Sequence, residues 1–396
     1  MRLSTSLSRV LAAQSLLVTA VQSQDVPGGS PSQDWSPAPF TDFTKNIVFY
    51  PPSDSVQWWT LYARTLQLPD ESILLTWENY PKEPPLVNHP IWKSDDGGAT
   101  FYNYSQVEDK VNGWGMRFQP FLYTLPVSFG GFPAGTILAA GASCPFSLTG
   151  GVYIDLYAST DDGKTWSFVS HVAYGAGPET ITRYDKALWE PFILLYNNQI
   201  VLYYSDQTDD AHSQKLMHKT TNDLRIWSDA VPDVVTSING GAERPGMTTV
   251  AHIESTNKWI MTFEYCRPTN CLVHYKVADS PLLFNDAPIV QLHANNTEKT
   301  TGVSGPYVIW TPHPNRTDGS GLIIVSTSSR EELFINEDSA DVGGWKYVNI
   351  NHWSAYSRSL RIITVKGKKK LLLANGGNFG PGYLNSVAVA VVPIPT

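Results

Sequence analysis

Short apolar runs separated by turn residues fill most of the chain. No long stretch repeats its apolar positions with the 3.6-residue period of a helix. The runs fall into three recurring classes, and first-class runs begin near Thr60, Gln119, Glu190, Arg244, Gly305 and Ser357. A second and a third run follow each start, as SILLTWEN and HPIWKSDD follow TLYARTLQL. The pattern predicts six units with three visible strands each.

A fourth strand usually follows the turn that ends the third run, as TWSFVSHVA follows Gly163. The unit starts lie between 52 and 71 residues apart, which suits a four-stranded blade. Six such units are typical of a β-propeller. We therefore predict an all-β fold in which residues 24–396 form a single six-bladed β-propeller domain.

Two turns carry the same residue types at the same offsets. SDDGGATF (94–101) and STDDGKTW (159–166) both place Ser, Asp, Gly and Thr before an aromatic residue. The Asp can accept backbone N–H groups across the turn, and the Gly can supply a positive φ. A weaker copy, TTNDLRIW (220–227), keeps Asn222 and Trp227 but lacks the Gly. This is the Asp-box pattern of sialidase-like propellers. We expect it between the third and fourth strands, with a structural and not a catalytic role.

The first residues predict export. Arg2 and Arg9 precede an apolar run and then small residues, which is typical of a secretory signal peptide over residues 1–23. We therefore expect a secreted, extracellular protein. Three glycosylation sequons begin at Asn103, Asn295 and Asn315.

The three cysteines fit the same compartment. Cys266 and Cys271 are close enough in sequence to bridge one hairpin, and Cys144 in its apolar context would then be a buried thiol. Three unbridged thiols remain the alternative.

Charge and composition exclude several function classes. The formal charge is −8 and the only basic cluster is 368–370, so nucleic acid is not an expected partner. No segment after the leader approaches ~20 apolar residues, so no membrane partner is expected. The nine histidines show no zinc-type spacing, and we expect no metal, no cofactor and a monomer.

Charged residues recur in the first-class runs, which are the candidates for the innermost strands. Aligned by eye, the equivalent positions are Arg64, Gln119, Glu190, Arg244, Gly305 and Arg358. Burying charge is costly unless it is paired, so these groups are expected to meet in one polar pocket at the channel mouth. Second-class runs add polar residues at their ends, namely Glu78, Asp206, Glu264 and Asn375.

Two of these carboxylates lie on consecutive units, Glu190 in ALWEPF and Glu264 in MTFEYC. Such a pair suits hydrolysis of a glycosidic bond, with one general acid and one group that attacks the anomeric carbon or activates water. Trp189 and Tyr356 can stack on sugar rings. The structural alternative is that each glutamate only forms a salt bridge with Arg64, Arg244 or Arg358.

Three strings, ALWEPF, GGAERPGMTTV and TFEYC, resemble the fungal exo-arabinanases, and the similarity extends over nearly the whole mature chain. The resemblance implies a secreted six-bladed propeller that releases arabinobiose from the non-reducing end of α-1,5-L-arabinan with retention. Its catalytic pair falls on Glu190, assigned as acid/base, and Glu264, assigned as nucleophile, with Glu243 as a rival. The residues expected to bind the arabinan substrate are Arg64, Glu243, Arg244, Trp189, Tyr356 and Arg358.

Two other classes remain open. A sialidase could clamp a carboxylate with Arg64, Arg244 and Arg358. Against it, the expected Arg-Ile-Pro string reads Arg64-Thr65-Leu66, and no tyrosine nucleophile is identifiable. A non-catalytic carbohydrate-binding propeller would use the same glutamates only as hydrogen-bonding groups. Activity on arabinan, on a sialoside or on neither separates the three.

Overall fold

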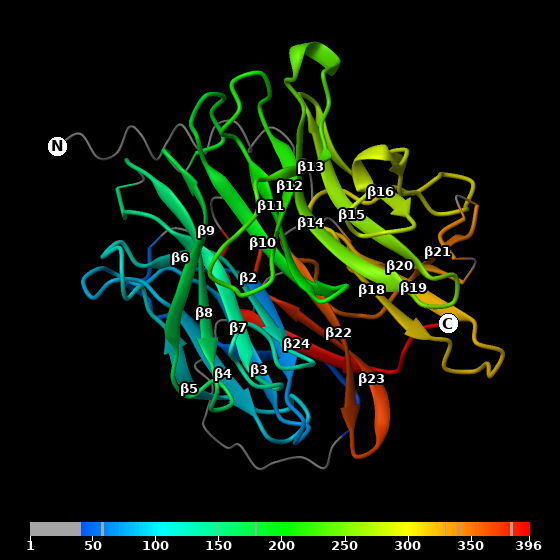
Figure 1. Ribbon diagram of the computed structural model, residues 1–396. Helices are drawn as coiled ribbons and strands as arrows, with labels where there is room; N and C mark the ends of the chain where they lie inside the picture. Colours follow the sequence, from blue (N-terminus) through cyan, green and yellow to red (C-terminus); the bar gives the residue numbers. More distant parts are fainter. Residues whose placement is uncertain are drawn as a thin grey trace.

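The computed structural model describes residues 41–396, with gaps at 57–58, 148, 179, 329, 338, 342 and 381–382. The signal peptide predicted over residues 1–23 lies outside this part. Six antiparallel four-stranded sheets are arranged as the blades of a propeller (Figure 1). The all-β, six-bladed prediction is therefore confirmed.

In blades 1 to 5 the strands follow one another in chain order from the channel outward. Blade 1 consists of β2 (Thr60–Gln67), β3 (Ile73–Asn79), β4 (His89–Ser94) and β5 (Tyr102–Val107). Blade 2 consists of β6 (Met116–Thr124), β7 (Ile137–Ser143), β8 (Val152–Ser159) and β9 (Ser167–Gly175). Blade 3 consists of β10 (Leu188–Tyr196), β11 (Gln199–Asp206), β12 (Lys215–Thr221) and β13 (Val231–Val234).

The second half of the ring repeats this order. Blade 4 consists of β14 (Arg244–Ile253), β15 (Lys258–Arg267), β16 (Asn270–Ala278) and β17 (Val290–Gln291). Blade 5 consists of β18 (Tyr307–Pro312), β19 (Gly321–Ser326), β20 (Leu333–Asn336) and β21 (Trp345–Val348). Blade 6 consists of β22 (Arg358–Val365), β23 (Lys368–Asn375), β24 (Val387–Val392) and β1 (Phe43–Phe49). Two short 3-10 turns, η1 (Ile238–Gly240) and η2 (Phe284–Asp286), lie in connections.

Blade 6 differs from the expected rule that a fourth strand follows the third. Its outer strand is β1, which precedes blade 1 in the chain and pairs antiparallel with β24. This pairing joins the two ends of the described chain, so the last blade is completed without an additional strand after β24.

The first strands of the six blades surround the axis, as the sequence predicted. β2 contacts β6 and β22, β10 contacts β6 and β14, and β18 contacts β14 and β22. Apolar side chains fill the space between blades, with Trp77, Tyr157, Tyr203 and Phe263 all fully buried. No helix in the part of the chain described here is long and apolar enough to cross a membrane.

The two strong turn motifs lie between the third and fourth strands of blades 1 and 2. Asp161 Oδ1 accepts the Thr165 N–H at 2.9 Å and the Ser159 hydroxyl at 2.7 Å, while Ser159 Oγ accepts the Gly163 N–H at 2.9 Å. Ser94, Asp96, Gly98 and Thr100 form the same bonds in blade 1. These aspartates hold turns on the outer side of the blades, as expected.

The weaker copy in blade 3 is shifted by one residue from the sequence prediction. Thr221 and Asp223, not Thr220 and Asn222, form the bonds: Asp223 Oδ1 accepts the N–H groups of Arg225 and Ile226 at 2.8 Å. Leu224 has a φ of 65° and takes the strained position without a glycine. The Thr-Asp pair two residues apart is the spacing that the turn requires.

Each of these turns also ties its blade to the preceding one. In blade 3, Trp227 Nε1 donates to Ser170 Oγ on β9 at 3.0 Å, and the Ser170 hydroxyl donates to the Leu224 carbonyl at 2.7 Å. Ser105 on β5 makes the equivalent contacts with Trp166 and Gly163. The turns therefore stabilise the packing of neighbouring blades away from the channel.

Candidate active site

Five of the six innermost strands carry or begin next to a residue in the left-handed region. The residues, with φ between 45° and 62°, are Tyr62, Gln119, Glu190, Met247 and Gly305. In four strands the pairing register shifts at this point, which marks a β-bulge. A bulge re-aims a side chain relative to its strand. Tyr62, Gln119, Glu190 and Met247 all line the central pocket, together with Arg64, Phe121 and Phe192.

The bulges correct the register that the sequence predicted. Arg64 and Arg244 were aligned with Glu190, but Tyr62 and Met247 occupy the equivalent positions. A bulge inserts a residue without a distinctive local sequence, so alignment by apolar pattern misses it. Tyr62 is consequently a site residue that sequence reasoning did not find.

Glu190 is held by groups from three other strands or their ends. Its Oε2 accepts the Ser205 hydroxyl and the Met247 N–H, both at 2.7 Å, and its Oε1 accepts the Tyr62 hydroxyl at 3.1 Å. Burial raises the pKa of Glu190, while these three donors and the charge of Arg244 act in the opposite direction. Ser205 on β11 had no signal in the sequence beyond its place near the end of a second-class strand.

Glu264 lies near the end of β15 and is buried, with 8% of its surface exposed. Its Oε2 accepts the Ser304 hydroxyl and, at 3.4 Å, the Gly305 N–H. Burial, and next the charge of Glu190, raise its pKa to about 7; Ser304, Arg244 and Gly305 oppose the rise. The charge of Glu190 thus disfavours the ionised form of Glu264.

The position of Gly246 sets an upper limit on the distance between the carboxyl groups of Glu190 and Glu264. Because a Cβ built on Gly246 would lie 3.5 Å from Oε1 of Glu264 and 3.6 Å from Oε2 of Glu190, these two oxygens are at most about 7 Å apart, the sum of the two distances. Retaining glycosidases hold their carboxyl groups about 5–5.5 Å apart, and inverting ones about 6.5–9.5 Å. The pair is therefore within reach of one glycosidic bond.

A third carboxyl group, that of Glu78, belongs to the same site and is 1% exposed. It accepts the N–H of Gln119 at 2.8 Å, as Glu190 accepts that of Met247 and Glu264 that of Gly305. In all three cases a carboxylate accepts the backbone N–H of a residue with positive φ. That residue lies on, or just before, the innermost strand of the next blade. The conformations of these residues and the positions of the carboxyl groups therefore depend on one another.

Arg244 faces the pair, and Arg64 lines the pocket. Burial lowers the pKa of Arg244, while Glu264 and Glu190 oppose this, and its Nη2 donates to Gln207 Oε1 at 3.1 Å and to Gln214. Arg64 lies over the rings of Tyr62 and Tyr307, at 5.1 and 5.4 Å. Within the described residues, the ion pairs include neither Glu190 nor Glu264, so simple salt bridges do not account for the pair.

Arg358 does not join this group. Arg358 is fully buried. Its Nη1 donates to the carbonyls of Glu331 at 2.9 Å and Trp353 at 3.2 Å, and its Nη2 donates to the carbonyl of Glu332 at 2.9 Å. A buried guanidinium that binds three loop carbonyls in this way holds the loops together. The three-arginine clamp considered from the sequence is therefore not formed.

Three further residues predicted from the sequence, Tyr356, Trp189 and Glu243, differ in their surroundings. Tyr356 is half-buried and packs edge-on against Tyr62 at 5.6 Å; burial and then the charges of Glu264 and Glu190 raise its pKa. Trp189 is also half-buried, and its Nε1 donates to Gln207 at 3.2 Å. Glu243 is buried and accepts a bond from Asn239 at 2.7 Å.

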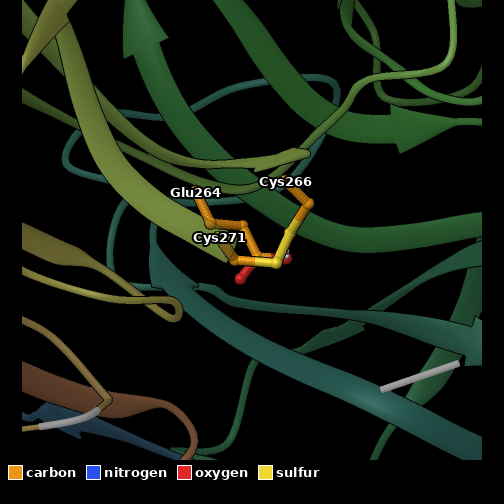
Figure 2. A group of neighbouring side chains, drawn as sticks. All are labelled: Glu264, Cys266 and Cys271. Atoms are coloured by element: carbon orange, nitrogen blue, oxygen red, sulfur yellow. Dashed lines mark hydrogen bonds between the residues drawn. A yellow bond between two sulfur atoms is a disulfide. The ribbon is translucent and has the colours of Figure 1, made fainter. Parts of the chain in front are cut away.

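Cys266 and Cys271 form a disulfide next to Glu264, as Figure 2 shows. The bridge that the sequence made possible is thus present, and Cys144 is buried outside it. The carboxyl of Glu264 and the two sulfurs lie within 4.8 Å of one another. Both sulfurs are already oxidised, so they do not act as thiolate ligands for a metal ion.

Solved structures resemble this one closely. The GH93 α-L-arabinofuranosidase of Fusarium graminearum, in complex with arabinobiose, is 39% identical with a TM-score of 0.84, over 89% of this chain and 98% of that chain. The α-L-arabinanase of Penicillium chrysogenum, complexed with arabinobiose, is 37% identical with a TM-score of 0.83 and the same coverage. The NanB sialidase of Streptococcus pneumoniae, at 9% identity and a TM-score of 0.55, shares the fold alone. No protein-family model and no curated protein sequence matched the chain.

The six-bladed propeller, with two neighbouring glutamates beside its central pocket, and these relatives together define a β-propeller glycoside hydrolase. With more than a third of its residues identical to the Fusarium enzyme over nearly that enzyme's whole length, the chain belongs to glycoside hydrolase family 93. The resemblance to fungal arabinanases that ALWEPF, GGAERPGMTTV and TFEYC indicated is confirmed.

Proposed function

We propose that this protein is a secreted, retaining exo-α-1,5-L-arabinanase that releases arabinobiose from the non-reducing end of arabinan. The observation that carries the proposal is the pair Glu190 and Glu264, at most about 7 Å apart and in different hydrogen-bonding environments. The relatives complexed with arabinobiose support the choice of substrate.

The environments favour a division of roles opposite to the one assigned from the sequence. Burial raises the pKa of Glu190, but three hydrogen bonds to its carboxylate, two of them at 2.7 Å, and the charge of Arg244 oppose this rise and favour the ionised form. Glu264 has a pKa of about 7, which suits a group that gives and takes a proton near neutral pH. We therefore assign Glu190 as the nucleophile and Glu264 as the acid/base.

The reaction then proceeds in two steps. Glu264 protonates the glycosidic oxygen while Glu190 attacks the anomeric carbon, so the glycosidic bond breaks and an ester between the sugar and Glu190 forms. Glu264, now ionised, takes a proton from water, whose oxygen attacks the same carbon and releases Glu190. Two inversions leave the product with the starting configuration.

Neighbouring residues support this chemistry. The Tyr62 hydroxyl steadies the ionised nucleophile, and Arg244 offsets the negative charge of the pair. Trp189, Tyr356 and Arg64 are the groups available to contact the furanose rings. We also propose that residues 1–23 are removed on export, which N-terminal sequencing of the protein from culture medium would test.

Product analysis on linear and branched arabinan tests the reaction. Arabinobiose should be the first and main product, and the viscosity of the polymer should fall slowly because the enzyme removes only chain ends. A ladder of longer oligosaccharides with a rapid loss of viscosity would contradict exo action. Activity on a sialoside and none on arabinan would contradict the substrate assignment.

Azide rescue tests the two roles. Glu264→Ala should still form the glycosyl-enzyme from an arabinobioside with a phenolate leaving group, and azide should then give the azide of retained configuration. Glu190→Ala should give the opposite configuration, because azide occupies the nucleophile's place. The matched control is Asp155→Asn, which changes a fully buried carboxyl group on the third strand of blade 2. Exchanged outcomes would reverse the roles, and full activity of Glu190→Ala on arabinan would refute the pair.

A further inference from the structure

The disulfide lies on the same face of its strand as Glu264. Cys266 and Cys271 are cross-strand partners at the end of the β15–β16 hairpin, and Cys266 is two residues after Glu264. Side chains two apart in a strand point to the same side. Figure 2 shows the bridge beside the carboxyl group, and the Cys266 Sγ is 3.4 Å from Oε1 of Glu264.

A second connection runs through the backbone of the same hairpin. The carbonyl of Cys271 accepts the Ser304 N–H at 2.8 Å, and the Ser304 hydroxyl donates to Oε2 of Glu264. Ser304 has a φ of 55°, a conformation that needs support from its neighbours. One oxygen of Glu264 therefore contacts the disulfide, and the other is held by a residue that the disulfide-bonded hairpin positions.

A disulfide sulfur has no proton to donate, so it gives no hydrogen bond to the ionised form of Glu264. Where it touches Oε1 it also takes the place of water. Both effects favour the protonated carboxyl over the carboxylate. A serine hydroxyl or a water molecule at this position would act in the opposite direction, because either can donate to Oε1.

We propose that the Cys266–Cys271 disulfide is a positioning element of the catalytic site, which fixes Glu264 through Ser304 and keeps hydrogen-bond donors away from its Oε1. This inference rests on the proposed role of Glu264 as acid/base. Other ionisable groups that act on Glu264 or respond to its charge include Glu190, Arg244, Tyr356 and Tyr62, and replacing the two cysteines substitutes none of them.

The test is the double variant Cys266→Ser/Cys271→Ser, compared with Cys144→Ser as a thiol control away from the pair. Activity requires protonated Glu264, so kcat/KM of the wild type should fall above about pH 7. In the double variant this basic limb should move to lower pH by about one unit, and kcat on arabinan should fall about tenfold. An aryl arabinobioside with a good leaving group should lose much less, because its departure needs little protonation.

A merely structural bridge would alter the melting temperature and leave the pH profile and the leaving-group dependence unchanged. That result in the folded double variant would overturn the proposal. If the double variant does not fold, Cys144→Ser protein is reduced with dithiothreitol, its two thiols are counted, and it is then reoxidised. The same basic-limb displacement should appear on reduction and reverse on reoxidation; an unchanged profile with two free thiols would overturn the proposal.

Failure of this inference is distinguishable from failure of the proposed function. If Glu264→Ala hydrolyses arabinan at the wild-type rate, the acid/base assignment is wrong. If Glu264→Ala is inactive while removal of the bridge leaves the pH profile unchanged, only the role of the disulfide is wrong.

Discussion

Glu78→Gln should make the stability of the protein less dependent on pH. The Glu78 carboxyl is buried and accepts the Gln119 N–H and the Tyr80 hydroxyl, each at 2.8 Å. Burial raises its pKa from 4.5 to about 7, and Glu190 adds to the rise, while Gln119, Tyr80 and Arg64 oppose it. A glutamine keeps an oxygen for the Gln119 N–H and cannot ionise.

The sign and the size follow from the difference between the two states. A carboxyl whose pKa is higher in the folded state contributes stability that is fully present below its unfolded pKa and is lost as pH rises through its folded pKa. The window for Glu78 therefore runs from about pH 4.5 to about pH 7. At about 1.4 kcal/mol per pKa unit, this amounts to roughly 3 kcal/mol.

Equilibrium denaturation followed by tryptophan fluorescence at several pH values between 4 and 8 measures this. Other buried acids also titrate in this range, among them Glu264 and Asp233, so the quantity to compare is the variant minus the wild type. That difference should grow in favour of Glu78→Gln by about 3 kcal/mol between pH 4 and pH 8. Glu254→Gln, at an exposed position on the β14–β15 turn, is the control for the glutamate-to-glutamine exchange itself. Parallel curves for Glu78→Gln and the wild type would refute the reasoning.

Two further substitutions separate the outer turns from the channel. Asp161→Ala should lower the free energy of unfolding by roughly 1–3 kcal/mol, because the turn loses its acceptor for Ser159 and Thr165. The kcat of the folded protein should stay near wild type. A large loss of kcat at unchanged stability would contradict the structural role of the turn. Gly246→Ala should place a Cβ 2.7 Å from Nε2 of Gln214, whose amide binds the Pro245 carbonyl and Arg244. In the folded variant kcat/KM should fall by about tenfold or more. Wild-type kinetics would show that this packing is unimportant.

Much of the fold could be predicted because its signals are local. Alternation of apolar and polar residues and the turn residues between runs place all six innermost strands close to their observed starts. The motif around Asp161 fixed the boundary between a third and a fourth strand for the same reason, since its bonds span only seven residues. The closing strand, Phe43–Phe49, was missed because its partner in β24 lies at the other end of the chain, and no local pattern encodes that pairing.

The sequence indicated the two glutamates that the structure places close together, but not the register of the strands around them. Glu190 and Glu264 were identifiable because a charged residue in an apolar strand is costly to bury unless it is paired or serves a function. The roles of Tyr62 and Met247 depend on the bulges. These residues lie two and three positions from Arg64 and Arg244, the residues that the sequence alignment placed there. Arg358 looked equivalent to Glu190 by strand alignment, but its surroundings are loop carbonyls, and loop positions are not readable from the sequence.

The bulges also explain why folding and catalysis cannot be separated in this propeller. A residue with positive φ is strained, and Glu190 and Met247 both adopt this conformation. Glu190 Oε2 binds the Met247 N–H, while the N–H of Glu190 itself points to Gln119 Oε1 at 3.5 Å, and the Gln119 N–H is bound by Glu78. The position of Glu190 is therefore set by contacts that run from blade 1 to blade 4. Because each contact crosses a blade boundary, the blades must be correctly packed before the carboxyl groups reach their places, and the outer turns that stabilise this packing act on the reaction only through it.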